Sequence, residues 1–198
     1  CRSGLCLAGD GRDCSDLDES CRIGLCAEAS ASCEAVPKPD DTGCHDNSVC
    51  TIADLCRDGE CVGVALPDQT VCDDGNPNTP RSVCLDGECL ASRLYGVNPG
   101  ITYNCPAGIA FAIALLEFVD DGQTLTVLGA PVLMTGPGNI ASGGSFAVSG
   151  SMGEGGCVQT YRLTGTFNAT GWQGQFRAEY SMGCACTWGI FNVQGTLK

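Results

Sequence analysis

The amino-acid sequence predicts a protein in two parts of different fold class, of which the second is all-β. The first is a run of disulfide-rich small repeats with little regular secondary structure, and the second is an antiparallel meander forming a small barrel or a sandwich. Three observations predict this. Thirteen of the 17 cysteines lie before residue 90, acidic charge is concentrated over the same stretch, and later residues form short β-prone runs separated by turn residues.

The change in composition places the boundary between the two parts. Residues 1–96 hold 18 acidic side chains against 7 basic ones, and residues 97–198 hold 5 against 3. We therefore expect cysteine-rich repeats over residues 1–92 and a β domain over residues 97–198. The intervening stretch around residues 90–100 contains Gly and Pro, and we interpret it as a linker or a first turn.

The first part is an internal repeat with a period of 28 residues. Residues 33–61 and 61–89 match at eleven positions, and the closing element C-x-x-G-x-C occurs four times, at residues 1–6, 21–26, 56–61 and 84–89. Its glycine suits a tight turn that needs positive φ. The first closing element starts the chain and no signal peptide is recognisable, so we expect the repeats to continue a longer array.

Cysteine density of this kind persists as disulfides in an oxidising compartment, so we expect a secreted protein. The chain has no CxxC pair and a single histidine, which disfavours a zinc site. Each module has too few apolar side chains for a core of its own, and each bridge contributes about 2–4 kcal/mol. The expected framework comprises Cys1, Cys6, Cys14, Cys21, Cys26, Cys33, Cys44, Cys50, Cys56, Cys61, Cys72, Cys84, Cys89, Cys105, Cys157, Cys184 and Cys186.

The number of cysteines before residue 90 is odd, and Cys50 corresponds to Asn78 in the next repeat. One cysteine of the repeats is therefore free, paired with the β domain, paired with another chain, or separated from its partner by truncation. If the β domain has six strands, Cys105 lies at the end opposite to the other three and is the natural partner for the odd cysteine. If a strand is miscounted, two bridges form inside the β domain instead.

The segment CDDGNPNTPRSVCLDGEC (72–89) resembles the cysteine-rich repeats of large secreted and surface proteins of myxobacteria and related delta-proteobacteria. The resemblance covers about residues 1–90. It implies export and a modular surface protein, and it implies no enzymatic activity and no catalytic residues.

In the β domain we expect six strands, over residues 107–119, 123–134, 144–151, 157–167, 172–181 and 187–197. The first of these is apolar on both faces, which predicts that both are covered. One explanation is cover by other parts of this chain, and the other is burial against a second copy. The candidate self-association residues are Ile109, Phe111, Ile113, Leu116 and Phe118.

Several polar residues are candidates for catalytic or metal-binding sites. His45 has no neighbouring nucleophile, which favours a solvated loop residue over a general base. Asp73, Asp74 and Asn76 offer oxygen ligands for calcium, but without the spacing of an EF-hand, so a solvated acidic loop is the favoured interpretation. We expect no other metal and no cofactor.

Two further features concern surface recognition. Asn168 begins an N-glycosylation sequon in an expected turn. Trp172 and Trp188 are interpreted first as core or interface residues, although a tryptophan on a strand can also serve as a platform for a sugar ring.

The net charge of −13 disfavours nucleic acid and anionic membranes as partners, since both select basic patches. The longest apolar stretch, residues 107–119, is shorter than the about 20 residues of a membrane-spanning helix. No nucleophile–base pairing is recognisable, so we expect no enzyme. The first hypothesis is a self-assembling structural subunit of a cell-surface filament, stalk or sheath, and the second is an adhesin or carbohydrate-binding β domain carried on a cysteine-rich stalk.

Overall fold

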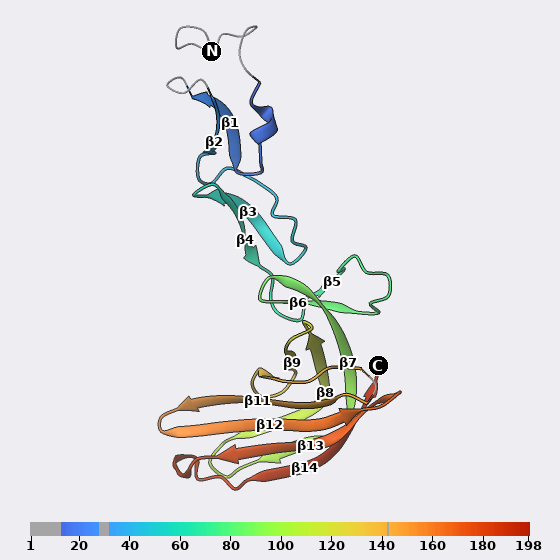
Figure 1. Ribbon diagram of the computed structural model, residues 1–198. Helices are drawn as coiled ribbons and strands as arrows, with labels where there is room; N and C mark the ends of the chain where they lie inside the picture. The colour runs from blue at the N-terminus through green and yellow to red at the C-terminus, as the bar shows by residue number, and fades with distance from the viewer. Residues whose placement is uncertain (1–12, 28–31, 142) are drawn as a thin grey trace. The chain divides into compact units, whose positions relative to one another are not determined.

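The structure is a computed structural model that describes residues 13–27, 32–141 and 143–198 (Figure 1). The described residues form β-strands and two short 3-10 helices, and they contain no α-helix. The chain divides into two compact units: Cys1–Thr70 with Cys84–Cys89 (unit 1), and Val71–Val83 with Leu90–Lys198 (unit 2). The predicted fold class is confirmed, because disulfide-linked short strands precede an antiparallel barrel.

Unit 1 consists of two-stranded hairpins preceded by a short 3-10 helix, Ser15–Leu17. Its hairpins expose most of their aliphatic side chains, including Leu25, Ile52 and Val64, whereas Cys14, Cys21, Cys50 and Cys56 are almost completely buried. Disulfides therefore occupy the place of an apolar core, as expected for modules this small. The hairpins pair β1 (Arg22–Ala27) with β2 (Ser32–Pro37) and β3 (Thr51–Arg57) with β4 (Glu60–Ala65).

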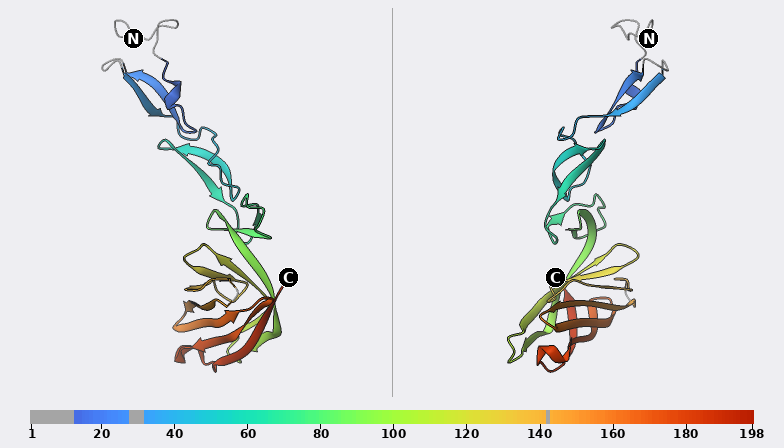
Figure 2. Two further views of the ribbon diagram at one scale, coloured as in Figure 1. Left: turned by 45° about the vertical axis from the view of Figure 1, so that its right-hand side comes forward. Right: turned by 90° about the vertical axis from the view of Figure 1, so that its left-hand side faces the viewer.

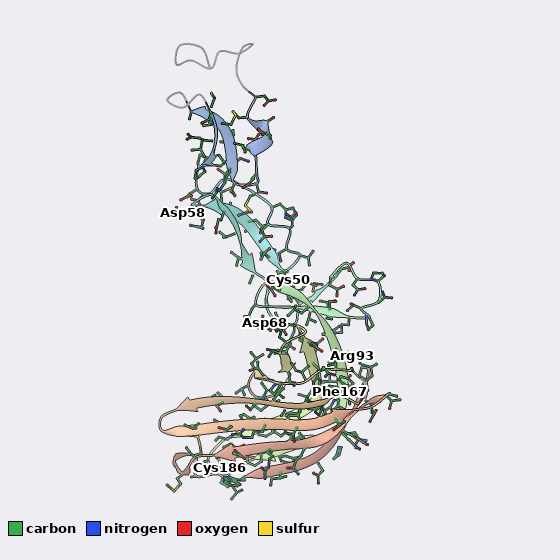
Figure 3. The ribbon with its side chains drawn as sticks, viewed as in Figure 1. Cys50, Asp58, Asp68, Arg93, Phe167 and Cys186 are labelled. Carbon is green, nitrogen blue, oxygen red and sulfur yellow. A yellow bond between two sulfur atoms is a disulfide. The ribbon has the colours of Figure 1, made fainter. Side chains whose placement is uncertain are left out.

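The 28-residue sequence period is also a period of backbone hydrogen bonds. The Cys56 N–H donates to the Thr42 carbonyl at 2.8 Å, and the Cys84 N–H donates to the Thr70 carbonyl at the same distance. In the closing turns at residues 56–61 and 84–89 an Asp–Gly pair has positive φ, at 51° and 81° in one copy and at 50° and 83° in the next. The predicted turn is wrong for residues 21–26, where Gly24 lies within β1 and has no positive φ. The first residue of each pair, Asp58 or Asp86, also donates its backbone N–H to the aspartate 18 residues earlier (Figure 3).

All described cysteines are disulfide-bonded, which indicates an oxidising compartment. Cys26, Cys72 and Cys89 are among the bonded residues. Cys50, which has no counterpart in the last repeat, pairs with Cys84 of the next copy. The pairs are Cys14–Cys33, Cys21–Cys56, Cys44–Cys61, Cys50–Cys84, Cys105–Cys186 and Cys157–Cys184.

The expected link from the repeats to Cys105 is therefore wrong, because Cys105 pairs with Cys186 and Cys157 pairs with Cys184. Cys50 bonds forward into the following repeat, and the last repeat is followed by the barrel rather than by another copy. A cysteine at position 78 would have no equivalent partner 34 residues later, which accounts for Asn78 there.

Unit 2 is a closed antiparallel barrel of eight strands, each paired with its neighbour along the chain and with the last strand returning to the first (Figure 2). The closure pairs Gln194 with Asn98 and Leu197 with Tyr95. β5 (Val71–Cys72) and β6 (Ser82–Leu85) extend the sheet beyond β7. The barrel strands are β7 (Glu88–Asn104), β8 (Ala110–Asp120), β9 (Leu125–Leu128), β10 (Met134–Gly136), β11 (Ser145–Glu154), β12 (Cys157–Phe167), β13 (Gly171–Tyr180) and β14 (Gly189–Leu197).

Two predicted boundaries in the barrel were wrong. The expected linker around residues 90–100 belongs to β7, and the expected strand over 123–134 is two strands, β9 and β10. Pro99 and its flanking glycines indicated a turn, but the strand passes through them by a shift of register between Gly96 and Ile101. Because residues 123–134 form two strands instead of one, Cys105 lies at the same barrel end as Cys186, which explains why the bridges form within the barrel.

The barrel interior is filled with aromatic side chains. Phe118 is fully buried and makes edge-to-face contacts with Tyr95, Phe146 and Phe167, with ring centroids 5.3–5.4 Å apart. Such contacts stabilise a core beyond the area they bury. The largest fully buried side chain is that of Trp172.

The apolar strand predicted for self-association supplies part of this core. Three of its candidate residues, Ile113, Leu116 and Phe118, are buried in the barrel core. The other two, Ile109 and Phe111, are partly buried against that core, so all five side chains pack within their own chain. Cover by the rest of this chain does not extend to the first half of the strand, where Ala110, Ala112 and Ala114 are exposed. The alanines leave little apolar surface in water, whereas Leu115 is 47% exposed.

Candidate functional site

The two tryptophans have opposite environments in the barrel. The side chain of Trp172 is buried with 1% exposed, whereas Trp188 is 67% exposed. Trp188 immediately precedes β14, in which Gly189 faces the interior and Ile190 faces outward. Because side chains alternate along a strand, Trp188 projects on the same outer side as Ile190. The tryptophan that can meet a ligand is therefore Trp188.

The loop that carries Trp188 is held at several points. Cys184 bonds to Cys157 on β12, and Cys186 bonds to Cys105 at the end of β7. The hydroxyl of Tyr103 donates to the Thr187 carbonyl at 2.6 Å. Cys186 lies at the end of the barrel where β13 and β14 meet (Figure 3). These links fix the backbone on which the indole is mounted, which lowers the entropy lost on binding.

A shallow hollow of about 250 Å³ lies beside the indole of Trp188. Glu179 is held by Arg162, whose Nε lies 3.4 Å from Oε2, and by Arg177, whose Nη1 lies 3.9 Å from Oε1. Thr160 contributes a hydroxyl, 3.0 Å from that of Ser151. The hollow thus combines one flat apolar face with hydrogen-bonding groups, and it is lined by Val158, Thr160, Glu179, Tyr180, Ser181 and Trp188.

Beneath the hollow the barrel end contains stacked tyrosines. The ring of Tyr180 stacks on that of Tyr103 at 5.3 Å between centroids, and its buried hydroxyl has no hydrogen-bond partner within the part of the chain that the structure describes. Burial raises the pKa of Tyr180 far above its ordinary value. Burial also raises the pKa of Tyr161, whose hydroxyl donates to Gln159 Oε1 at 2.6 Å. Both phenols therefore stay neutral, and Tyr180 lines the hollow.

The weak calcium candidates are engaged in local turns. Asp73 accepts the N–H of Gly75, and Asp74 accepts the N–H of Asn76, each at 2.9 Å. The hydrogen bond from Asn76 lowers the pKa of Asp74. Within the described ranges neither aspartate belongs to a group of three or more His, Cys, Asp or Glu ligand atoms. The loop is organised by its own backbone.

The sequon residue Asn168 lies in the exposed turn between β12 and β13, as the sequence predicted for that turn. Its Oδ1 accepts the N–H of Thr170 at 3.0 Å and the Thr170 hydroxyl at 3.2 Å. The side chain is accessible at the surface.

The structure brings together three polar residues that sequence reasoning did not group. The potential ligand atoms of His45, Asp46 and Asp54 all lie within 4.8 Å of one another. His45 and Asp46 are adjacent in sequence, whereas Asp54 lies eight residues further along, on β3. No sequence spacing motif joins them, and the approach depends on an irregularity of β3.

Comparison of the chain with family models, with curated proteins and with solved structures gave no match. No described segment forms a helix long and apolar enough to cross a membrane. The functional proposals below therefore depend on the chemistry of the residues described above.

Proposed function

We propose that this protein is an extracellular, non-enzymatic binding module in which the barrel recognises a saccharide through Trp188 and cysteine-rich repeats carry the barrel. The observation that supports this proposal is the exposed indole on a disulfide-held loop, beside a hollow with hydroxyl and carboxylate groups. The disulfides and the resemblance of the repeats to secreted surface proteins favour an extracellular location.

A pyranose ring has one apolar face of C–H groups and a rim of hydroxyls. The indole of Trp188 can stack on such a face, while Thr160 and Glu179 at the edge of the hollow can bond the hydroxyls. The hollow is smaller than the about 300–1,000 Å³ of sites that enclose drug-sized ligands. We therefore propose recognition of one or two sugar units of a longer glycan, with weak affinity per site.

The carboxylate of the hollow supports binding rather than hydrolysis. A glycosidase ordinarily uses two carboxyl groups flanking the scissile bond. Among the described residues that line the hollow, Glu179 is the single carboxylate, and two arginines hold it. Glu179 therefore offers its carboxylate oxygens as hydrogen-bond acceptors to a sugar hydroxyl.

Self-association is a second candidate function, and it is favoured by the apolar side chains exposed around the same barrel end. An exposed apolar cluster of this kind can also contact another chain. In this proposal copies of the protein associate through the outer surface near Trp188 rather than through β8. The exposed residues are Met152, Val158, Met182, Trp188 and Ile190.

A glycan array with the oxidised chain, followed by titration of the best oligosaccharide, separates the two proposals. Trp188→Ala should lose at least about tenfold in affinity, since one aromatic stacking partner contributes more than 1 kcal/mol. Ile190→Ala is the matched control, because Ile190 is an exposed apolar residue of the same region and does not line the hollow.

Light scattering coupled to size-exclusion chromatography gives the second readout. A monomer at high concentration together with glycan binding that depends on Trp188 supports the saccharide proposal. No binding across the array, with an oligomer that Trp188→Ala dissociates, would reject it in favour of self-association.

A further inference from the structure

The cluster of His45, Asp46 and Asp54 in unit 1 has the composition of a metal site. The imidazole Nδ1 of His45 lies 3.5 Å from Oδ2 of Asp54. The backbone nitrogen of Asn47 lies 3.2 Å from the same Nδ1. An imidazole nitrogen and a carboxylate oxygen at this separation are two ligand atoms that one cation can bind.

The buried end of Asp54 indicates that a ligand is missing from its surroundings. Only 10% of the Asp54 side chain is exposed, and its Oδ1 has no hydrogen-bond partner among the described residues. An unpaired buried carboxylate oxygen is costly in free energy. Oδ2, in contrast, accepts the N–H of Asp46 at 3.3 Å.

A β-bulge directs Asp54 into the cluster. The register of β3 against β4 shifts between Ile52 and Leu55, and Ala53 has a φ of 56°, a conformation that L-residues rarely adopt. Bulges re-aim side chains and are frequent beside functional sites. Without the shift, strand alternation alone would set the direction of Asp54.

Gly63 on β4 leaves the space that the carboxylates occupy. A Cβ atom at this position would lie 2.3 Å from Oδ1 of Asp54 and 3.1 Å from Oδ2 of Asp46. Both oxygens therefore approach the same point above the glycine. The bulge and the glycine are independent features of the two strands, and both make room for the same pair of carboxylates.

Asp46 is oriented by a second layer of hydrogen bonds, as metal ligands commonly are. The Thr51 hydroxyl lies 2.9 Å from Oδ1 and 2.8 Å from Oδ2, and the Ser48 N–H donates to Oδ1 at 2.8 Å. These hydrogen bonds from two residues fix the orientation of the Asp46 carboxylate.

We propose that His45, Asp46 and Asp54 bind a divalent transition-metal ion of the zinc type, a site that goes beyond the saccharide proposal and does not depend on it. Two carboxylates neutralise the charge of the ion, and a neutral imidazole suits zinc but not calcium, which takes oxygen ligands. Ligand atoms of a tetrahedral zinc ion lie about 3.4 Å apart, close to the 3.5 Å between Nδ1 and Oδ2.

The site is open to solvent on one side, as an ion and its remaining ligands require. The His45 side chain is 76% exposed and lines a surface hollow of about 440 Å³ within unit 1. Water can complete the coordination from this side. The metal ties the loop after Cys44 to strand β3, so its expected role is to stabilise a module that has almost no apolar core.

The last repeat provides a natural comparison. At an offset of 28 residues, Asp74 is equivalent to Asp46 and Thr79 is equivalent to Thr51. The positions equivalent to His45 and Asp54 are occupied by Asp73 and Ser82. The ligand set is therefore incomplete in that copy. Asp74→Asn, which changes the counterpart of Asp46, is the matched control for a substitution in the cluster.

The test is a titration of the whole oxidised chain with zinc chloride, after alkylation with iodoacetamide so that no thiol can bind the metal. Calorimetry measures stoichiometry and affinity, and ¹⁵N NMR follows the imidazole, which is unambiguous because the chain has one histidine. Cobalt(II) provides a visible spectrum that reports four-coordination. Calcium chloride is the contrasting probe.

We expect one zinc equivalent per chain and a large shift of the Nδ1 resonance. Asp54→Asn and His45→Gln should each weaken binding at least about tenfold, while Asp74→Asn binds like the wild type. Because the His45 side chain is exposed, His45→Gln should fold and tests the site even if Asp54→Asn does not fold. The proposal is overturned by no binding up to about 1 mM zinc, by an unshifted imidazole, by unchanged affinity in His45→Gln, or by calcium binding with equal affinity.

Discussion

The ion pair between Arg81 and Glu117 in unit 2 offers a sharp test of what stabilises the barrel. Glu117 is an acidic residue on β8 whose side chain is only 5% exposed. Its Oε1 accepts a hydrogen bond from Arg81 Nε at 2.6 Å and another from the Ser92 hydroxyl at 2.7 Å. Arg81→Ala would leave the carboxylate buried with Ser92 as its remaining partner.

The expected loss follows from this geometry. A hydrogen bond to a charged group contributes about 1.5–3 kcal/mol, and breaking a fully buried ion pair costs about 3–5 kcal/mol. Arg81 is 34% exposed, so water can replace part of the lost interaction. We therefore expect Arg81→Ala to lower the free energy of unfolding of the barrel by about 2–3 kcal/mol and its Tm by about 10 °C.

Urea denaturation of the oxidised protein, followed by the fluorescence of buried Trp172, measures the loss. Arg162→Ala is the control, since Arg162 forms an exposed pair with Glu179 that should contribute less than about 1 kcal/mol. Adding Glu117→Gln to Arg81→Ala removes the unpaired charge and should restore at least about 1 kcal/mol. A loss below about 0.5 kcal/mol in Arg81→Ala, or no recovery in the double variant, would refute the reasoning.

Two further predictions concern the disulfides and acid stability. Replacing Cys105 and Cys186 by Ala should lower the free energy of unfolding by about 4–5 kcal/mol, because the bridge spans 81 residues; calorimetry showing an unchanged Tm would contradict this. The N–H groups of Thr124 and then Gln123 lower the pKa of Asp121, so its stabilisation is present above the unfolded value near 4 and is lost as pH falls through the lower folded value. The stability difference between wild type and Asp121→Asn should therefore be constant above pH about 5 and shrink at lower pH; a difference independent of pH would exclude this role.

The candidate site on the barrel could be predicted in part. Trp188 was recognised as a residue that could face a sugar, but the same residue type at position 172 is buried. The difference depends on which face of its strand each tryptophan occupies, and on the loop bridged by Cys184 and Cys186. Sequence alternation alone does not show which face points inward when strand boundaries shift by one residue.

The cluster around His45 could not be predicted from spacing. The sequence favours a solvated loop residue for His45, and it gives no reason to group Asp46 or Asp54 with it. Their approach requires the bulge at Ala53 and the space above Gly63. Neither feature has a distinctive sequence signal, because a bulge depends on pairing between two strands and not on one residue type.

The sequence by itself determined the repeat period, the need for disulfides and the β class of the C-terminal domain. Each of these follows from local composition: cysteine spacing, the scarcity of apolar side chains in the modules, and alternating β-prone runs. The tertiary structure decided the disulfide partners of Cys50 and Cys105, the inclusion of residues 90–100 in β7, and the direction of Asp54. These depend on barrel closure and strand register, which are set by contacts between residues far apart in the chain.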